Sequence, residues 1–425
     1  MNIQLSPYKN KKICVALSGG ADSMALLHYI NARKNEFGIT LFAVHLEHGI
    51  RGEKSVADAN FVKNYCEKEN IFLIIERANC IEYSTQNKMG IEEGARAVRY
   101  SIFNDILNSG KADFIFTAHH ADDNAETVLF NLFRGSALKG AGGIANLRGK
   151  IARPMLSVDK EQILSYVREN DIPFVVDESN FDTKYTRNFI RHQLIPKAKE
   201  IFPNLCERIY TFSQSVREDD DFVYSLAQKE CKLDCGAITF SDSLEKPIFT
   251  RACLIAFKYF GGVKDYVQEN FNAVYSLQNL ENGSKISLPY SLTAIREYGK
   301  IAIYREKECE NKEIDFGEGE FEFCNGRLKI VKGKEKGLLI DGDKLPQGAV
   351  IRTRKSGDIF QKFGSGTKKL KDFLIDKKIP SRLRNFIPVV AKDNEIYAVC
   401  GVEISEKVKI DRNSGNIYSI IYEKE

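Results

Sequence analysis

The sequence predicts an α/β protein that opens with a doubly wound parallel sheet. Short apolar runs alternate with helical patterns from Ile13 to Asn170, which is typical of a parallel sheet covered on both faces. Polar residues gather directly after several of these runs, at the edge where such sheets bind ligands. Beyond Pro203 the pattern changes to longer amphipathic helices, and the final part mixes strands with a short helix. We therefore expect a mainly helical middle domain and a small mixed α/β C-terminal domain.

The period of the apolar residues predicts the individual elements. In the first part we expect strands at Ile13–Leu17, Thr40–His45, Ile71–Ile75, Phe114–Ala118 and Lys150–Pro154, and helices at Ser23–Phe37, Glu53–Asn70, Ile91–Gly110, Asn124–Arg134 and Asp159–Asn170. Further along we expect helices at Asn204–Leu233, Arg251–Leu280 and Lys368–Asp376, and strands at Ala349–Thr353, Ile387–Ala391 and Ile396–Val402.

The length of 425 residues exceeds one typical core, so several domains are expected. The changes of pattern predict domains at 1–203, 204–305 and 337–425. Between Glu306 and Glu322 there are eight acidic residues and two lysines, and this composition predicts a linker over 306–336.

Bulk composition predicts a cytoplasmic protein with no membrane partner. The N-terminal residues lack a signal-peptide pattern, and the apolar runs are too short to cross a bilayer. The ten cysteines include no Cys-x-x-Cys pair, which favours reduced thiols over a disulfide framework or a zinc site.

The loop Ser18-Gly19-Gly20-Ala21-Asp22-Ser23 joins the first predicted strand to the first helix. Such a turn aims backbone N–H groups and the positive end of a helix at one point, which suits phosphate. Ser18 and Ser23 add hydroxyl groups, and Asp22 is a candidate Mg²⁺ ligand. The Gly-x-x-x-x-Gly-Lys pattern of common nucleotide-triphosphate loops is absent. An ordinary strand-to-helix turn is the alternative.

Two further segments place polar groups near this edge. His45-Leu46-Glu47-His48-Gly49-Ile50-Arg51 ends the second strand, and its rings and guanidinium could contact phosphate, a base edge or a carboxylate. The alternative is a strand end with satisfied polar groups. The helix that follows Gly90 has Glu92, Arg96 and Tyr100 on one face at four-residue spacing, for which an exposed ion pair is the alternative.

The segment from His119 to Glu126 carries more carboxylates than helix capping requires. Asp122 and Asp123 can cap the predicted helix, but capping accounts for only one of them. With Glu126 they form a carboxylate cluster that could bind magnesium or an ammonium group. Arg187 and Arg191, four residues apart, could face a polyanion or form a solvated basic face.

The C-terminal part is strongly basic. From Ile351 to Lys392 there are twelve Lys or Arg and three acids, interleaved with Phe360, Phe363, Phe373 and Phe386. This pattern suits a nucleic-acid backbone with some base stacking, although charge runs are usually solvated faces. The RNA-contact candidates are Arg191, Arg352, Arg354, Lys368, Lys369 and Lys371.

Taken together, these motifs resemble those of the tRNA(Ile)-lysidine synthetases. The resemblance covers nearly the whole chain and rests on Ser18–Ser23, His45-x-x-His48-x-x-Arg51, Glu92-Glu93-x-Ala95-Arg96, His119-His120-x-Asp122-Asp123-x-x-Glu126-Thr127, Arg153-Pro154, Arg187-Asn188-x-Ile190-Arg191, Lys368–Phe373, Ile379-Pro380 and Pro388-Val389-Val390. Asn124 departs from the family, which usually has Gln there, and its shorter amide can make similar hydrogen bonds.

The resemblance implies a pyrophosphate-loop ATPase with a Rossmann-like sheet of the adenine nucleotide alpha hydrolase type. It implies that ATP, with Mg²⁺ as co-ion, adenylates the C2 oxygen of the wobble cytidine (position 34) of the CAU-anticodon isoleucine tRNA. Free L-lysine then displaces AMP and forms lysidine, which changes the codon read from AUG to AUA. The chain is also compatible with a homodimer.

The resemblance also implies roles for individual residues. ATP would bind to Ser18, Gly19, Gly20, Ala21, Asp22 and Ser23, with Asp22 positioning Mg²⁺. Asp123 and Glu126 would bind the ammonium of lysine, with Asp122 as a further partner, and Arg187 would steady charge near the α-phosphate. The remaining pocket candidates are His45, Arg51, Glu93, Arg96 and His119. The target base would leave its stack, because C2 is not reachable within a stacked anticodon.

Three other classes of protein are alternatives, and one feature of the sequence argues against each. A tRNA 2-thiocytidine-forming enzyme would need cysteine pairs that the sequence lacks. An amide-forming synthetase, such as those making NAD or GMP, would not need the basic tail. A non-enzymatic, ATP-sensing RNA-binding protein would leave the carboxylate cluster unexplained.

Overall fold

The computed structural model describes residues 1–49, 53–176, 186–262, 266–307, 312–323, 326–364 and 366–424. The chain forms two compact units, Met1–Asp221 (unit 1) and Phe222–Glu425 (unit 2). Arg51, one of the predicted pocket residues, lies outside the described residues, as does the segment 177–185. Among the described helices, none is both long and apolar enough to cross a membrane.

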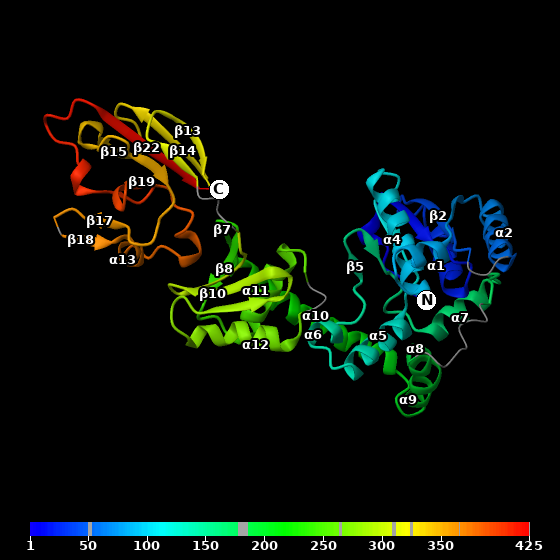
Figure 1. Cartoon of the computed structure of the whole chain (residues 1–425). Helices are drawn as coiled ribbons and strands as arrows, with labels where there is room; N and C mark the ends of the chain where they lie inside the picture. Colours follow the sequence, from blue (N-terminus) through cyan, green and yellow to red (C-terminus); the bar gives the residue numbers. More distant parts are fainter. Residues whose placement is uncertain are drawn as a thin grey trace. The chain divides into compact units, whose positions relative to one another are not determined.

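Unit 1 is built on a six-stranded sheet in the order β3-β2-β1-β4-β6-β5. Figure 1 labels the strands β2 and β5 of this unit among its helices. The strands of the sheet are β1 Lys12–Ala16, β2 Thr40–Glu47, β3 Phe72–Arg77, β4 Phe114–Phe116, β5 Leu147–Arg148 and β6 Ile151–Ala152. The first five strands in this order run parallel, as predicted, whereas β5 pairs antiparallel with β6. The sequence analysis did not predict this edge hairpin.

Helices cover both faces of this sheet, as a doubly wound fold requires. They are α1 Ala21–Asn31, α2 Glu53–Lys68, α3 Cys80–Gln86, α4 Ile91–Asn108, α5 Ala121–Phe133, α6 Leu138–Ala141, α7 Lys160–Glu169, α8 Thr186–Phe189 and α9 Ile195–Ile201, and α10 Leu205–Glu230 begins in this unit. Side chains alternate along a strand, so Val15 packs in the core that contains α1 and α7, while Cys14 packs with Phe103 of α4.

The strand order reverses direction at β1, which is the switch point where such sheets bind ligands. The chain leaves β1 for β2 on one side, and β4 pairs with β1 on the other. The loop after β1 and the loop after β4 therefore meet at the same edge. Gly19 has φ +88° in the first loop, a conformation that disfavours other residues, and α1 begins directly after Gly20.

Unit 2 begins with helices around a second sheet. Its helices are the end of α10, α11 Lys246–Tyr259 and α12 Gln268–Ser276, and its strands are β7 Lys232–Asp234, β8 Ala237–Ser241, β9 Lys285–Leu288, β10 Leu292–Glu297 and β11 Lys300–Arg305. The end of α10 lies within a predicted helix, whereas α11 begins at Lys246, before the predicted start at Arg251, and the single helix predicted at Arg251–Leu280 is two helices, α11 and α12. The five-stranded antiparallel sheet β7-β8-β11-β10-β9 was not predicted. Its strand β7 takes Lys232 and Leu233 from the end of one predicted helix, and Leu277–Asn279 at the end of another form a 3₁₀ turn.

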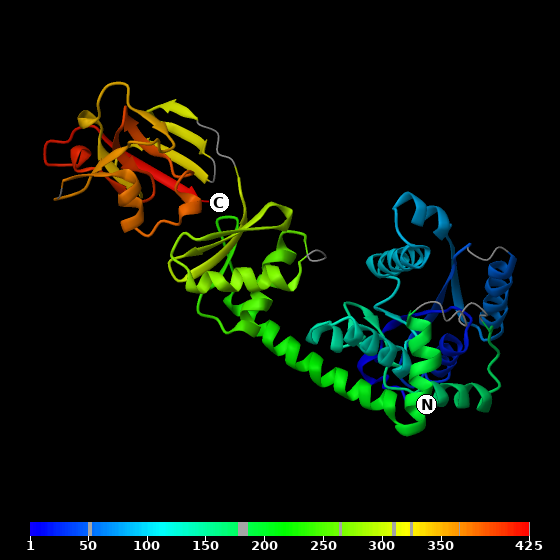
Figure 2. The ribbon, with the colours of Figure 1, turned by 60° about the horizontal axis from the view of Figure 1, so that its bottom comes forward.

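The C-terminal part of unit 2 consists of two packed sheets and a short helix (Figure 2, yellow to red). Its elements are β12 Glu313–Asp315, β13 Gly319–Phe323, β14 Gly326–Lys332, β15 Leu338–Asp341, β16 Val350–Arg352, β17 Ile359–Gln361, β18 Thr367–Lys369, α13 Leu370–Asp376, β19 Val389–Lys392, β20 Glu395–Val399, β21 Glu403–Ile404 and β22 Ile417–Lys424. Ile330 and Ile420 of one sheet and Ile351 and Val390 of the other share a core.

The acidic stretch differs from the predicted linker. Its described residues form β12, β13 and β14, which pair with β16 and β22 of the C-terminal sheets. Burial of alternate residues such as Phe323 and Leu328 outweighs the charge on the exposed face. Residues 308–311 and 324–325 lie outside the described part.

Candidate active site

A cleft of about 410 Å³ lies at the switch point of unit 1. Its lining comes from the loop after β1, the end of β2, one face of α4, the loop after β4 and the turn before α9: Ala16, Leu17, Ser18, Gly20, Asp22, Ser23, Val44, Leu46, His48, Arg96, Arg99, Tyr100, Ile102, Phe103, Thr117, Ala118, His119, Asp123 and Arg191. The cleft therefore lies at the carboxyl ends of the strands, where the sequence predicts a ligand site, and several residues of the predicted motifs line it.

The glycine loop is held by the two hydroxyl groups that flank it. Ser23 Oγ donates to the Gly20 carbonyl at 3.0 Å and accepts from the Ser18 N–H at 3.2 Å. Ser18 Oγ lies 3.0 Å from Ser23 Oγ. No side chain caps α1 at Gly20, so its first N–H groups and its dipole point into the cleft, as a phosphate site requires.

Asp22 stands in the first turn of α1 between two basic side chains. Lys160, the first residue of α7, forms an ion pair with Asp22 Oδ1. The Nε2 atom of His120 lies 3.7 Å from Asp22 Oδ2 and 3.4 Å from Asp123 Oδ2. The Asp22 side chain is 30% exposed, so it can also reach a ligand in the cleft.

Asp123 and Glu126 form a paired carboxylate site on α5. Asp123 Oδ2 caps the helix by accepting from the His120 N–H at 3.0 Å, and this leaves Oδ1 for Arg191 Nη2 at 2.9 Å. The Glu126 carboxyl is 8% exposed, with Arg191 Nη2 at 2.8 Å and Arg187 Nε at 3.9 Å. Burial raises the pKa of the Glu126 carboxyl, and the Arg191 charge opposes this rise. The structure thus brings together the two predicted lysine-binding carboxylates and adds a guanidinium between them.

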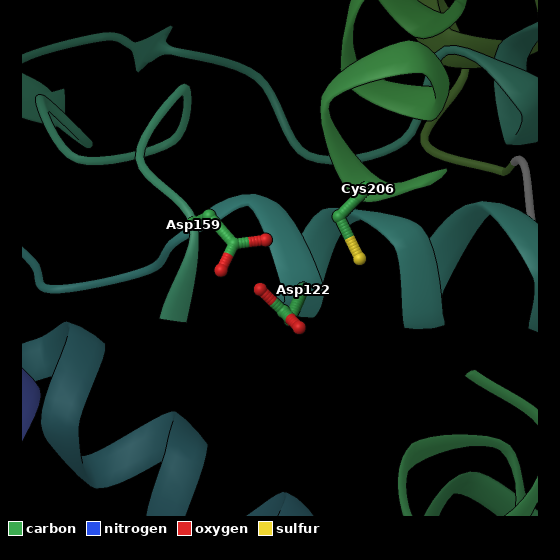
Figure 3. A group of neighbouring side chains, drawn as sticks. All are labelled: Asp122, Asp159 and Cys206. Carbon is green, nitrogen blue, oxygen red and sulfur yellow. The ribbon is translucent and has the colours of Figure 1, made fainter. Parts of the chain in front are cut away.

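Asp122 points away from this pair into a cluster with Asp159 and Cys206 (Figure 3). The Lys199 ammonium lies 2.7 Å from Asp122 and 3.2 Å from Asp159, so a protein cation already occupies the place that a metal ion would take. Burial alone would raise the pKa of Asp122, but the His120 ring, the Lys199 ammonium and the Lys160 N–H outweigh it and hold the pKa well below its usual range. Asp122 does not line the cleft.

Arg96 and His119 line the opposite wall, as predicted. Arg96 donates to the Tyr100 hydroxyl at 3.3 Å with its guanidinium over the ring, and Arg153 donates to the same hydroxyl at 3.4 Å. His119 Nδ1 lies 2.9 Å from Thr117 Oγ1. Burial lowers the pKa of His119 to about 4, so its ring is neutral at pH 7.

Besides Asp122, two more predicted pocket residues do not line the cleft. His45 is buried, and its Nδ1 donates to the Leu17 carbonyl at 2.8 Å, so it ties the end of β2 to the loop after β1. Glu93 is exposed in the first turn of α4, where a carboxylate favours the helix N-terminus. The prediction that these two side chains line the pocket is therefore wrong.

The predicted RNA contacts in the tail divide into accessible and buried side chains. Arg354, Lys369 and Lys371 line a cavity of about 1030 Å³ in unit 2. Lys368 is exposed and pairs with Asp376 at 2.5 Å. Arg352 is 2% exposed, and its guanidinium donates to both carboxylate oxygens of Asp358 at 2.8 and 3.0 Å. Arg352 cannot reach an RNA backbone, and the prediction for this residue is wrong.

Several residues in and around the cleft were not predicted, because they come together only in space. Lys160 and Lys199 reach their aspartates from 138 and 77 residues away, and neither stands in a recognisable motif. His119 was predicted as a pocket residue and His120, at the start of α5, was not. The ring of His120 lies among Asp22, Asp122 and Asp123. Tyr100, expected on the face of Arg96, also lines the cleft, and Arg99 could have been found from its three-residue spacing to Arg96.

The doubly wound sheet with its glycine turn at the switch point defines an ATP-using enzyme of the PP-loop class, and the PP-loop domain family matches residues 1–198. The TilS substrate C-terminal domain matches residues 349–421. The tRNA(Ile)-lysidine synthase of Caldanaerobacter subterraneus subsp. tengcongensis is 33% identical over 98% of this chain and 95% of that protein. The enzyme of the same name from Thermosipho africanus is 34% identical over 93% of this chain and 90% of that protein. The chain belongs to the tRNA(Ile)-lysidine synthase family.

Proposed function

We propose that this protein joins lysine to the wobble cytidine, position 34, of the CAU-anticodon isoleucine tRNA. In the first step the cytosine O2 attacks the α-phosphorus of ATP, and the bond to pyrophosphate breaks. In the second step the lysine ε-amino nitrogen attacks C2, and the C2–O bond breaks as AMP leaves. The product base is lysidine, which changes codon reading from AUG to AUA.

The proposal rests on one observation: the glycine loop and the carboxylate of Asp123 line the same cleft. The glycine loop suits the phosphates of ATP, and Asp123, which lines the same cleft, is paired with Glu126 through Arg191. A nucleotide and an amine can therefore be bound side by side, which amine transfer to an adenylated base requires.

In this proposal the loop Ser18–Ser23 grips the β- and γ-phosphates, and Asp123 and Glu126 bind the ammonium of lysine. The raised pKa of Glu126 also suits it to accept a proton from the amine. Arg187, half-exposed beside Glu126, steadies charge near the α-phosphate. Arg96 and His119 line the pocket, and Arg191 orients the two carboxylates instead of contacting tRNA.

The residues fit a Mg²⁺ ion at Asp22, because its carboxylate is partly exposed at the phosphate loop and carboxylate oxygens are preferred Mg²⁺ ligands. When bound, this ion would neutralise phosphate charge. The tail candidates Arg354, Lys368, Lys369 and Lys371 hold the tRNA by backbone contacts. Two further points stay predictions. One is the division into domains at 1–203, 204–305 and 337–425, with the stretch 306–336 between them. The other is the homodimer.

The test is incorporation of labelled lysine. The protein is incubated with ATP, labelled lysine and a CAU isoleucine tRNA transcript, with a methionine tRNA transcript of the same anticodon as the matched control. We expect label at the wobble cytidine and tRNA-dependent release of pyrophosphate with the isoleucine transcript alone. Absence of label, with an active family member run alongside, would overturn the proposal.

A further inference from the structure

The far end of α5 carries exposed side chains that have no role in the proposed chemistry, and the neighbouring Arg187 links them to it. Phe133 is 63% and Leu132 57% exposed, and Phe189 of α8 is 52% exposed. Phe130, one turn before Phe133 on the same helix, lies 5.2 Å from the guanidinium carbons of both Arg134 and Arg187. Exposed aromatic groups beside cations mark an interaction surface. We call Phe130, Phe133, Arg134, Arg187 and Phe189 the α5 platform.

This platform adjoins the Asp123–Glu126 carboxylate pair, of which Asp123 lines the cleft. Arg187 spans the join, since its Nε lies 3.9 Å from Glu126 Oε1 while its guanidinium stands over Phe130. Glu126 and Phe130 are one helical turn apart, about 6 Å, and Phe133 is about 10 Å from Glu126 along the axis. A strand whose target base lies at Asp123 in the cleft can therefore pass Glu126 and reach the platform.

The local charge selects the kind of ligand. From Thr127 to Val158, the segment that includes the far end of α5, the sequence carries five Lys or Arg and no Asp or Glu, so no acidic residue of this segment opposes a phosphate at Arg134. Arg134 and Arg187 lie over the Phe130 ring and are not consumed by it, so their N–H groups can also donate to phosphate oxygens. Exposed rings supply stacking faces for bases, and both features together are what single-stranded nucleic acid requires.

We propose that the α5 platform binds the RNA nucleotides that flank the modified base, by stacking on Phe133 and by phosphate contacts to Arg134 and Arg187. This inference rests on the proposed function and names a part of the RNA surface that it needs. A base that leaves its stack to enter the cleft exposes its neighbours, and the platform gives them a new stacking partner.

The test compares Phe133→Ala and Arg134→Ala with the matched variants Phe72→Ala and Arg168→Ala. Phe72 is 70% exposed on β3, an edge strand of the sheet, and Arg168 is exposed on α7. We expect the KM for an RNA hairpin carrying the target loop to rise roughly 5- to 100-fold in the platform variants. The kcat, the KM for lysine and the binding of ATP without RNA should change less than about two-fold in all four variants.

A hairpin with an abasic nucleotide beside the target base separates stacking from other effects. With this RNA the wild type and Phe133→Ala should have the same KM, because the stacking partner is gone. Equal KM values for platform and control variants on the intact hairpin would overturn the inference. A dimer that Phe133→Ala converts to a monomer would assign the platform to a second copy of the chain and overturn it too.

The proposed function fails separately. If the wild type incorporates no lysine into any RNA, the proposed function is at fault. If it incorporates lysine and the platform variants match their controls, only the platform inference is overturned.

Discussion

Arg191 directs two nitrogens of its guanidinium, Nε at 2.9 Å and Nη2 at 2.8 Å, at the single Oε2 oxygen of Glu126. Arg191 lies in a π-helical turn, Ile190–Leu194, between α8 and α9. Turns of this kind are frequent at functional sites because they re-aim a side chain. The second oxygen of Glu126 remains directed toward the more distant Arg187.

Glu126→Gln should block lysine transfer and spare adenylation. The substitution keeps the shape but removes the charge that would bind an ammonium group, so transfer should fall about 100-fold or more, in line with the 2–5 kcal/mol of a lost charged partner. Single-turnover assays should find pyrophosphate release retained and the adenylated RNA accumulating. Glu207→Gln on the exposed face of α10 is the control. Equal loss of both steps would place Glu126 in ATP binding instead.

Asp22→Asn should block the adenylation step. It removes the carboxylate at the phosphate loop and leaves Lys160 without its partner, so RNA-dependent pyrophosphate release should fall about 100-fold. The RNA affinity, measured by filter binding, should stay within about two-fold of the wild type. Asp105→Asn on α4 provides a surface control. Normal pyrophosphate release would contradict the assignment.

Asp122→Asn should lower the stability of unit 1 without changing ATP binding. The folded-state pKa of Asp122 lies below its unfolded value, so its contribution is complete above about pH 4 and is lost as the pH falls through the folded pKa. Loss of the pair with Lys199 should cost about 2 kcal/mol. Urea unfolding should give the same difference from wild type at pH 7 and pH 5. A difference that grows between these values would show that another group is responsible.

Lys369→Gln with Lys371→Gln should weaken tRNA binding and its salt dependence. Both side chains are exposed and line the cavity of unit 2. If each contacts one phosphate, the slope of log Kd against log salt should fall by about 2. Lys334→Gln with Lys336→Gln, in the turn before β15, removes the same charge elsewhere. An unchanged slope in the first variant would exclude these lysines from the RNA contact.

Arg352→Ala should act on folding instead of RNA. Its removal leaves the Asp358 carboxylate buried without its guanidinium, at a cost of about 3–5 kcal/mol. The midpoint of urea unfolding should fall markedly. The salt slope of RNA binding, measured where the variant is folded, should match the wild type.

The periodicity of the sequence predicted the fold of unit 1 well, because a parallel strand is buried on both faces and reads as a continuous apolar run. Ile13 to Ala16 is such a run, and the cleft lies where that run ends. The antiparallel sheet of unit 2 escaped prediction because its strands are short and two of them, β7 and β9, carry exposed lysines. Asn124, singled out as a departure from the family, is fully buried and donates to Ser213 Oγ at 3.0 Å, so its shorter amide is a packing feature.

Site residues were predictable where they stand in a compact motif and unpredictable where they meet across the chain. Asp123 and Glu126 share one face of α5, which spacing alone indicates. Arg352 was misjudged because a charge count does not distinguish an exposed arginine from one buried against Asp358. His45 was misjudged for the same reason, since a polar residue at a strand end can serve a backbone carbonyl or a ligand equally well.

The Arg191 guanidinium between Asp123 and Glu126 competes with any amine that binds these two carboxylates. An amine that binds these carboxylates must displace or share a tethered competitor, whose effective concentration is on the order of millimolar. A small cation or an amine that offers only positive charge has no advantage in binding free energy over the Arg191 guanidinium. A successful substrate must bring further contacts, so discrimination among amines begins before any bond is formed.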